Sequence, residues 1–479
     1  MLEGQTNIFE MIYPTYKITK KIRTIELFAG YGSTKLAWNY LGTDVESYKI
    51  CEWAVKSIQA YKDIHFTDDN FDYSKDLSIE EIKQYLFNKG ISSNYNEPMT
   101  QQQVNRLSEK QLRTIYNNIV ATHNLVNIQQ VKGEDLEIVD TDKYDYILTY
   151  SFPCQDLSLA GKGKGMSDTS TRSGMLWEVE RILVECNELG NLPEILLMEN
   201  VPQVHGIDNI EDFNKWQLKL EQLGYKNYVQ DLIATDYGIP QTRNRCFMVS
   251  ILGDYNYTFP KPIPLKLKLK DMLEDNVSDK YFLSEKMLNC FLKESQGGYP
   301  RKEKFYQSLN RVNDNNISNT ITTLEGNRDI STFIKIKNAT KKGYLEATDG
   351  DGVDISSRME YHRGTVQKGK TQTITTAGGE NNGVCVLGNY MKSNHNASRV
   401  VDKEFSAPTV MENHGTITAT QTTDLRIRKL TPRECFRLMG VKDKDFDNVS
   451  KNQSDSSLYH LAGDSIVVNV LCYLYKQLI

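Results

Sequence analysis

One cysteine, Cys154, occupies a position at which the sequence could perform chemistry. The apolar residues Ile147 and Leu148 suit a buried parallel strand, and residues 151–153 break it. The thiol should therefore lie on a turn at the carboxyl edge of a sheet, where open α/β folds bind ligands. Pro153 fixes its own φ and lacks an N–H, which helps to hold the next residue in one orientation. Although most lone intracellular cysteines are small buried hydrophobes, this context favours a nucleophile.

A carboxylate and two guanidinium groups could act beside that thiol. Glu199 ends a second apolar strand at the same sheet edge, and a carboxylate in such a place needs a partner or a function. Arg243 and Arg245 alternate with period two, so both side chains should point to one face. We expect that face to hold an anionic or acceptor-rich group; the alternative is an ordinary salt-bridge pair on the surface.

A glycine-bearing turn near the amino end is typical of a nucleotide site. A short buried strand from Ile25 breaks into the turn 28–32, which contains Phe28, Gly30, Tyr31 and Gly32. The glycines would let the backbone approach a ligand, and the helix that follows would offer free N–H groups. A tight structural turn explains this motif equally well, and a dinucleotide oxidoreductase would prefer GxGxxG.

Two further segments point to an adenosine-containing cofactor. Glu52 and Trp53 end a second strand about twenty residues later; the acid could accept both ribose hydroxyls and the indole could stack on adenine. The turn at Asp135 and Leu136 carries acids that could reach the adenine amino group. Any surface loop could look the same as this last turn.

Three other stretches have more ordinary interpretations. Residues 67–130 form a polar insertion, and the apolar residues of its second half recur at helical spacing, which indicates accessory helices. The glycine-lysine loop 161–165 suits a lid that closes on phosphates or, equally, a solvated linker. Leu176 lies in the stretch that opens a long helix to about Leu189.

Composition limits the class of protein. The 479 residues, 39% of them hydrophobic and 25% charged, should form two domains of a soluble protein. No stretch approaches the roughly 18 apolar residues of a membrane span, and the first twenty residues lack the apolar core of a secretion signal, so we expect a cytoplasmic protein without a membrane partner. The eight cysteines are scattered without CxxC spacing, so their pattern indicates neither a zinc site nor a disulfide framework. The net charge of −5 argues against non-specific coating of nucleic acid.

In their order along the chain, these residues resemble the DNA (cytosine-5) methyltransferase family of bacterial or phage type. The resemblance covers most of the chain outside the inserts, and six motifs in sequence are far more specific than one. The matching segments are the first cofactor motif at 28–32, the nucleophile motif at 153–155, the acid motif at 199–201, the arginine motif at 241–245, the ninth motif at 428–440 and the tenth at 463–470. Glu26 stands where the first motif usually has Asp, and Asp464 where the tenth usually has Asn.

The resemblance implies a fold and a cofactor. The fold would be a Rossmann-like α/β domain that uses S-adenosylmethionine, with S-adenosylhomocysteine as product and no metal, joined to a smaller β-rich target-recognition domain. We expect the catalytic domain at 22–253, the recognition domain at 254–425 and a returning segment at 426–479. The cofactor residues would be Phe28, Gly30, Tyr31, Gly32, Glu52, Trp53, Asp135, Leu136, Pro153, Leu176, Asp464 and Ile466.

The resemblance also implies roles for the four catalytic candidates. Carbon 5 of cytosine is a poor nucleophile, so the Cys154 thiolate would first add to carbon 6. Glu199 would bind N3 and protonate it, which relieves the charge on the ring. Arg243 and Arg245 would hold the base at O2, orient Cys154 and lower its pKa. Because the target atom is inaccessible in a duplex, the base must be flipped out of the helix.

The recognition of a DNA sequence is assigned to the segment 254–424. Its net charge is +2, against −7 for the remaining chain, which favours DNA on this side. The hydroxyl-rich runs 319–323, 373–376 and 415–419 are β-prone and could contact DNA or form structural hairpins. After this segment, Thr431 and Glu434 should cap a helix. The resemblance implies that the last helix, from Ile466 to about Leu478, packs beside the N-terminal strand.

The sequence therefore predicts an enzyme that methylates carbon 5 of cytosine within a specific sequence of double-stranded DNA. An RNA cytosine-5 methyltransferase with the same chemistry is one alternative. A non-catalytic DNA-binding protein that retains the fold is the other, although a full set of catalytic candidates speaks against it. We expect a monomer, and a cognate restriction endonuclease is left open as a partner.

Overall fold

The computed structural model describes residues 13–152, 173–281 and 430–479, and between residues 310 and 429 it describes the backbone of short strands. Contacts between Cα atoms divide the chain into two units. The first unit comprises Met1–Ile239, Arg243–Leu265 and Phe436–Ile479, and the second comprises Pro240–Thr242 and Lys266–Cys435. The predicted boundaries at 253/254 and 425/426 lie earlier in the chain than these divisions and remain a proposal.

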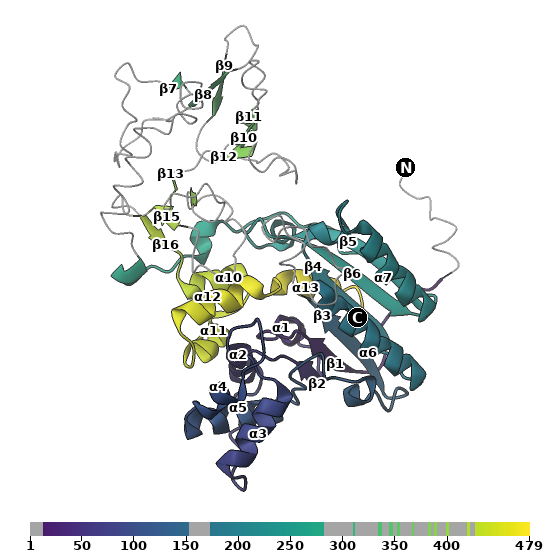
Figure 1. The fold of residues 1–479 in the computed structure, drawn as a ribbon. Helices are drawn as coiled ribbons and strands as arrows, with labels where there is room; N and C mark the ends of the chain where they lie inside the picture. The colour runs from purple at the N-terminus through teal and green to yellow at the C-terminus, as the bar shows by residue number, and fades with distance from the viewer. Residues whose placement is uncertain are drawn as a thin grey trace. The chain divides into compact units, whose positions relative to one another are not determined.

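A mixed sheet of six strands forms the centre of the first unit, in the order β2-β1-β3-β4-β6-β5 (Figure 1). β1 to β4 are parallel, whereas β6 pairs antiparallel with both β4 and β5. The carboxyl ends of β1 to β4 and the amino end of β6 therefore share one edge. The bounds are β1 Lys21–Leu27, β2 Val45–Cys51, β3 Tyr144–Tyr150, β4 Ile195–Asn200, β5 Tyr225–Ile233 and β6 Asn244–Leu252.

Two helices, α6 (Leu176–Glu188) and α7 (Ile210–Gln222), cover one face of this sheet. Side chains along a strand alternate between faces, so every second strand residue contributes to this core. The strand residues in it are Ile25, Leu27, Cys51, Tyr146, Leu148, Tyr150, Leu196, Met198, Tyr225, Cys246 and Met248. Phe213, Trp216 and Leu220 of α7 pack with them, as the helical spacing predicts.

The opposite face carries α1 (Ser33–Leu41) and α13 (Val468–Tyr475). The rings of Trp38 and Tyr475 stack at 4.0 Å between centroids. α13 lies against α1, and burial, together with the nearby carboxylate of Glu26 on β1, raises the pKa of the Tyr475 hydroxyl of α13, in keeping with the expected packing beside the N-terminal strand. The residues that follow α13 reach the segment before β1, where the Ile18 N–H donates to the Leu478 carbonyl at 2.7 Å.

The insertion after α2 (Val55–His65) contains α3 (Ile79–Lys89), α4 (Gln101–Asn105) and α5 (Glu109–Ala121). Each of these three helices begins with a capping box, in which a hydroxyl and the side chain three residues later satisfy each other's backbone N–H groups. A separate apolar core joins the helices: Ile58, Ile82, Leu86, Ile91, Met99, Val104, Leu112, Ile115, Ile119 and Val126.

The described part of the second unit is rich in short strands. They form three small sheets, in the orders β11-β10-β12, β13-β14-β15-β16 and β7-β8-β9. Their bounds are β7 Asn310–Arg311, β8 Ile334–Lys337, β9 Tyr344–Ala347, β10 Gly352–Asp354, β11 Val366–Gln367, β12 Asn382–Val384, β13 Gly388–Asn389, β14 Arg399–Val401, β15 Ala419–Gln421 and β16 Ile427–Lys429. The predicted runs 319–323 and 373–376 lie outside the described residues, as does 415–418, while Ala419 begins β15.

Three helices follow the recognition segment: α10 (Pro432–Leu438), α11 (Asp443–Ser450) and α12 (Asp455–Asp464). The predicted cap of α10 is confirmed, because the Thr431 N–H donates to Glu434 Oε2 at 2.7 Å and the Glu434 N–H donates to Thr431 Oγ1 at 3.2 Å. Among the described residues, one stretch, Asp455–Tyr475, is long and apolar enough to cross a membrane. It comprises α12 and α13, and 67% of its window is buried inside the protein, as in a core helix.

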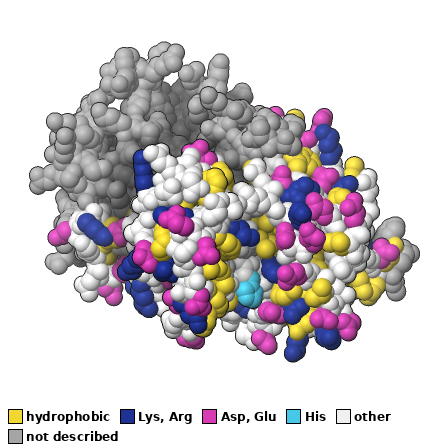
Figure 2. All heavy atoms as spheres, turned by 60° about the horizontal axis from the view of Figure 1, so that its bottom comes forward, with side chains coloured by type: hydrophobic (Ala, Val, Ile, Leu, Met, Phe, Trp, Pro, Cys, Tyr) yellow, Lys and Arg dark blue, Asp and Glu magenta, His cyan; other side chains and the backbone are white. Residues whose placement is uncertain are grey.

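The surface turned to the viewer in Figure 2 mixes basic and acidic side chains closely. No patch of one sign dominates this face of the described chain. Such a mixed surface is typical of a face in contact with solvent. A face that binds the phosphate backbone of DNA would carry clustered Lys and Arg side chains.

Candidate active site

The glycine-bearing turn after β1 has an unusual backbone. Phe28, Gly30 and Gly32 all have positive φ, at 58°, 56° and 80°. A left-handed conformation is a rare one for a residue as bulky as phenylalanine, and such strain concentrates at functional sites. The Phe28 N–H donates to the carbonyl of Cys51 at 2.8 Å, which ties the turn to the end of β2.

The two glycines of the turn have different surroundings. A Cβ at Gly30 would meet no atom within 4 Å, so this side of the turn is open to a ligand. A Cβ at Gly32 would lie 2.4 Å from Nε2 of His65 and 2.6 Å from the Tyr61 ring. His65 Nε2 lies 3.0 Å from the Tyr31 carbonyl oxygen, and burial lowers the pKa of His65 to about 3, which keeps the ring neutral. Gly32 is therefore required for packing, and Gly30 remains free to approach a cofactor.

Glu52 connects this turn to the second strand. Its Oε2 accepts the Gly30 N–H at 2.9 Å and its Oε1 accepts the Ala54 N–H at 2.8 Å. Burial raises the pKa of Glu52 to about 7, although both hydrogen bonds oppose the rise. A carboxylate offers about four lone-pair sites, so each oxygen can still accept a further donor such as a ribose hydroxyl.

The end of the insertion holds Glu52 in place. The side-chain amide of Asn124 accepts the Glu52 N–H at 3.0 Å and donates to the Glu52 carbonyl at 2.9 Å. The neighbouring Leu125 N–H donates to the carbonyl of Ile50 at 2.8 Å, so this segment runs along the edge of β2. The sequence alone does not reveal the role of Asn124, because a polar residue 72 positions after its partner carries no local signal.

The remaining predicted cofactor residues divide by exposure. Trp53 is partly buried against the core of the insertion, which leaves part of the indole accessible. Asp135, in the 3-10 turn Gly133–Leu136, is also partly exposed, and its Oδ2 accepts the Lys132 N–H at 2.8 Å. Tyr31, Leu136 and Leu176 are 1% exposed or less, so their side chains belong to the core and offer no surface to a ligand.

Glu26, the departure from the family's usual Asp, is a structural residue of β1. It is 1% exposed and accepts hydrogen bonds from the hydroxyls of Thr34 and Tyr61, which join β1 to α1 and α2. Burial raises the pKa of Glu26 to about 7. The Glu26 carboxylate therefore holds together the elements around the glycine turn, and it has no exposed surface for a cofactor.

Glu199 and Arg245 form the charged pair at the other end of the site. Arg245 Nε lies 3.1 Å from Glu199 Oε1, with the carboxylate on β4 and the guanidinium on β6. Burial raises the pKa of Glu199, although Arg245 and Arg243 both act to lower it. Glu199 is only 7% exposed. The carboxyl group is thus desolvated at the sheet edge where the nucleophile was predicted.

The segment that leads to Cys154 is anchored to the strand of Glu199. The Asn200 side-chain amide donates to the carbonyl of Phe152 at 3.0 Å, and both residues are buried. Pro153 and Cys154 themselves, and the loop 161–165, lie outside the described residues. Asn200 lies within the acid motif at 199–201, but the motif alone does not predict an anchor; its place directly after Glu199 on a buried strand is the signal that could have suggested this role.

Arg243 binds two backbone carbonyl groups. Its Nη2 donates to the carbonyls of Gly463 and Ser465 at 3.0 and 2.7 Å, and the side chain is 4% exposed. These two carbonyls flank Asp464. Because Arg243 is buried, it is not a surface residue, and its two hydrogen bonds fix the backbone on either side of a predicted cofactor residue.

Asp464 lies near both ends of the site. Its side chain is 45% exposed and its Oδ2 lies 3.0 Å from His460 Nε2. The negative charge of Asp464 raises the pKa of both Glu52 and Glu199. Three acids that are far apart in sequence therefore converge at one sheet edge. His460, one helical turn before Asp464, was not predicted, and Ile466 is mostly buried at 8% exposure.

The family model for the C-5 cytosine-specific DNA methylase matches residues 89–479. The chain is 39% identical over 274 residues to the orphan methyltransferase M.SssI of Spiroplasma monobiae, which covers 56% of this chain and 68% of that protein. It is 31% identical over 464 residues to the type II methyltransferase M2.ScrFI of Lactococcus lactis subsp. cremoris, which covers 95% of this chain and 99% of that protein.

Solved structures support the fold. A methyltransferase of Entamoeba histolytica, EhMeth, aligns with a TM-score of 0.52 and 12% identity, covering 96% of this chain and 98% of that one. The Dnmt2 methyltransferase of S. pombe aligns with a TM-score of 0.50 and 15% identity over the same shares. The extent of the family match and the full-length likeness to M2.ScrFI together place the chain: it belongs to the C-5 cytosine-specific DNA methylase family and is a DNA (cytosine-5) methyltransferase.

Proposed function

We propose that this enzyme methylates a flipped cytosine, within a specific sequence of duplex DNA, through a transient covalent bond to Cys154. The observation that carries the proposal is the pairing of buried Glu199 with Arg245 at the carboxyl end of β4. Asn200, the next residue, binds the carbonyl two positions before Cys154. An acid that can recognise a base is thus tied to the segment that bears the nucleophile.

S-adenosylmethionine fits the other end of the site. Glu52 keeps unused lone pairs for ribose hydroxyls, Gly30 has open space at its Cα, and Trp53 is partly accessible for stacking on adenine. Asp464 presents a half-exposed carboxylate that suits the cationic amino group of the methionine part. When bound, the cofactor supplies an electrophilic methyl group. Trp53 and Asp135 would hold its adenine, and the turn 28–32 would lie along its sugar.

The chemistry at the base follows from the predicted roles of Cys154 and Glu199. The thiolate adds to carbon 6, and the electron pair of the double bond moves toward carbon 5 while N3 takes the proton of Glu199. A raised pKa suits this role, because the carboxyl group must hold a proton near neutral pH. After methylation, carbon 5 loses its proton, which we assign to water, and the re-formed double bond expels the thiolate.

The two arginines receive different roles in this proposal. Arg245 pairs with Glu199 and would contact O2 of the cytosine as well, which positions the base against Cys154. Arg243 acts through the carbonyls of Gly463 and Ser465 and is a positioning residue for Asp464. The predicted influence of both on the pKa of Cys154 stays a proposal.

We further propose that residues 254–425 recognise the DNA sequence, that the reaction uses no metal cofactor, and that the enzyme is a cytoplasmic monomer. Membership of a DNA methylase family favours DNA over the RNA alternative. A cognate restriction endonuclease remains open as a partner. A labelled-methyl assay on both polymers tests the choice of substrate, and bisulfite sequencing of DNA from expressing cells reads the target sequence.

The covalent step has its own test. DNA that carries 5-fluorocytosine cannot lose a proton from carbon 5, so the enzyme should remain bonded to it and form a complex that survives denaturing electrophoresis. Cys154→Ala should abolish this complex and methyl transfer. A Cys154→Ala variant that methylates cytosine at the parental rate would overturn the proposal, and tight DNA binding by the parental enzyme without any complex would support the non-catalytic alternative.

A further inference from the structure

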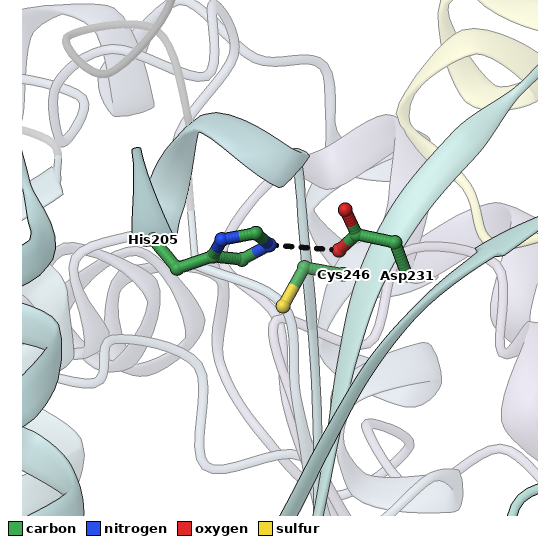
Figure 3. A group of neighbouring side chains, drawn as sticks. All are labelled: His205, Asp231 and Cys246. Atoms are coloured by element: carbon green, nitrogen blue, oxygen red, sulfur yellow. Dashed lines mark hydrogen bonds and ion pairs between the residues drawn. The ribbon is translucent and has the colours of Figure 1, made fainter. Parts of the chain in front are cut away.

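Three potential metal ligands lie close together near the sheet edge of the active site, on the face covered by α6 and α7. His205 belongs to the 3-10 turn η3 (Pro202–His205), Asp231 to β5 and Cys246 to β6. Their ligating atoms all lie within 4.8 Å of one another. Figure 3 shows His205 and Asp231 joined by their hydrogen bond, 2.9 Å long, with Cys246 between them. None of the three has a role in the reaction proposed above.

The sheet brings two of these ligands together. Asp231 and Cys246 are direct partners in the antiparallel register of β5 and β6, so their side chains share a face. Neighbouring strand residues point to opposite faces. Cys246 therefore points to the face covered by α6 and α7, while Arg245 reaches Glu199 on the other side. The group lies on the back of the site rather than inside it.

The dimensions suit a small tetrahedral ion. Zn²⁺ binds at about 2.0–2.3 Å from nitrogen, oxygen and sulfur, which places its ligand atoms about 3.3–3.8 Å apart. Here the ligating atoms lie within 4.8 Å of one another, and His205 Nε2 lies 2.9 Å from Asp231 Oδ1, so small side-chain shifts would reach these values. His205 and Asp231 are 35% and 33% exposed, so their side chains can rotate to adjust. Cys246 is fully buried, so its side chain is the least able of the three to move.

The donor set indicates which ion would bind. One imidazole, one carboxylate and one thiol suit Zn²⁺ or Co²⁺, whereas Mg²⁺ and Ca²⁺ require oxygen ligands. A half-exposed His–Asp pair contributes little stability by itself. We propose that His205, Asp231 and Cys246 form a Zn²⁺ site with three protein ligands and a fourth position for water. The S–H bond of Cys246 breaks as the Zn–S bond forms, and its proton leaves to the solvent.

Such a site would clamp three elements of the sheet edge. The ion would join the turn that follows Glu199 and Asn200 to the two antiparallel strands β5 and β6. An ion that binds the folded chain and not the unfolded one stabilises the fold. Saturating Zn²⁺ should therefore raise the melting temperature without supplying a group to the reaction.

Metal titration of the full chain tests the proposal. Cys154→Ala is used as the background, because the nucleophile could itself bind metal. After treatment with a chelator, this protein should bind one Zn²⁺ at the site, and Co²⁺ should give a thiolate-to-metal charge-transfer band. His205→Gln and Asp231→Asn should each weaken the affinity by about tenfold or more, as even the loss of an outer-shell partner does, and should remove the thermal shift. Cys246→Ser should remove the band.

Two matched variants control the experiment. His123→Gln changes an exposed histidine, and Cys186→Ser a buried thiol, both outside the group; each should leave affinity and band unchanged. If Cys246→Ser does not fold, the two part-exposed positions decide. Absence of stoichiometric binding, or unchanged affinity in both His205→Gln and Asp231→Asn, would overturn the site and leave the proposed methyltransferase chemistry untouched.

Discussion

The cofactor end and the base end of the site hold their carboxyl groups by different kinds of interaction. At the cofactor end, the Glu52 carboxylate accepts two backbone N–H groups, and Asn124 fixes its main chain on both sides. At the base end, Glu199 faces the guanidinium of Arg245 in a desolvated position. Backbone donors set a fixed shape, whereas burial beside a guanidinium controls the protonation of a carboxyl group. The first arrangement suits binding and the second suits a change of protonation during reaction.

The largest difference between the two ends is expected when the proton donor at the base end is removed. Glu199→Gln keeps the size of the side chain but loses the proton donor, so kcat should fall by about 10²–10⁴-fold. The dissociation constant of S-adenosylmethionine should stay at the parental value, because the cofactor end is untouched. Single-turnover methylation and isothermal titration measure the two quantities. An equal loss in both would show that the ends are not independent.

The reverse change acts on the cofactor end. Asn124→Ala leaves the buried N–H and carbonyl of Glu52 without their partner, and an unsatisfied buried group costs about 1–3 kcal/mol. We expect a dissociation constant for S-adenosylmethionine raised about tenfold, equivalent to about 1.4 kcal/mol, with kcat unchanged at saturation. Asn118→Ala is the matched control, since that amide of the same insertion donates to Gln59 instead. Equal losses in both variants would indicate general destabilisation of the insertion.

The smallest expected effect is a pH dependence of cofactor binding. The pKa of Glu52 is raised to about 7, so the carboxylate gains a proton as the pH falls through 7 and accepts ribose hydroxyls less well. Affinity for S-adenosylmethionine should weaken below pH 7, by at most about tenfold per unit, and Glu52→Gln should flatten the profile. A profile that keeps its slope in Glu52→Gln would assign the titration to another group.

The raised pKa of Glu52 affects the stability of the fold in the opposite direction from cofactor binding. The folded state binds more protons than the unfolded state between the ordinary pKa of glutamate and 7, because Glu26 and Glu52 both have raised values. The free energy of unfolding therefore falls as the pH rises through this window. The fold should be most stable where cofactor binding is weaker, and thermal melts across this pH range check the sign.

Much of the cofactor end could be predicted because its signals are local. The strand, the glycine turn and the following helix occupy one stretch from Lys21 to Leu41, and Thr431 and Glu434 cap α10 as expected. Tyr31 shows the limit: it lies within the same motif, yet its ring stacks on Phe436 and is buried. Whether a side chain in a turn faces a ligand or the core depends on a partner four hundred residues away.

The sequence by itself determined the types of the reacting groups, their order and the family, since buried strands that end in Cys, Glu or a glycine turn are visible in a single stretch. Only the tertiary structure decided which groups meet. Arg243 binds the carbonyls beside Asp464, Asn124 holds Glu52, and His205 reaches Asp231 and Cys246. The physical reason is that strand pairing and helix packing bring residues together across the chain, and a buried polar group bonds to whichever partner that packing supplies.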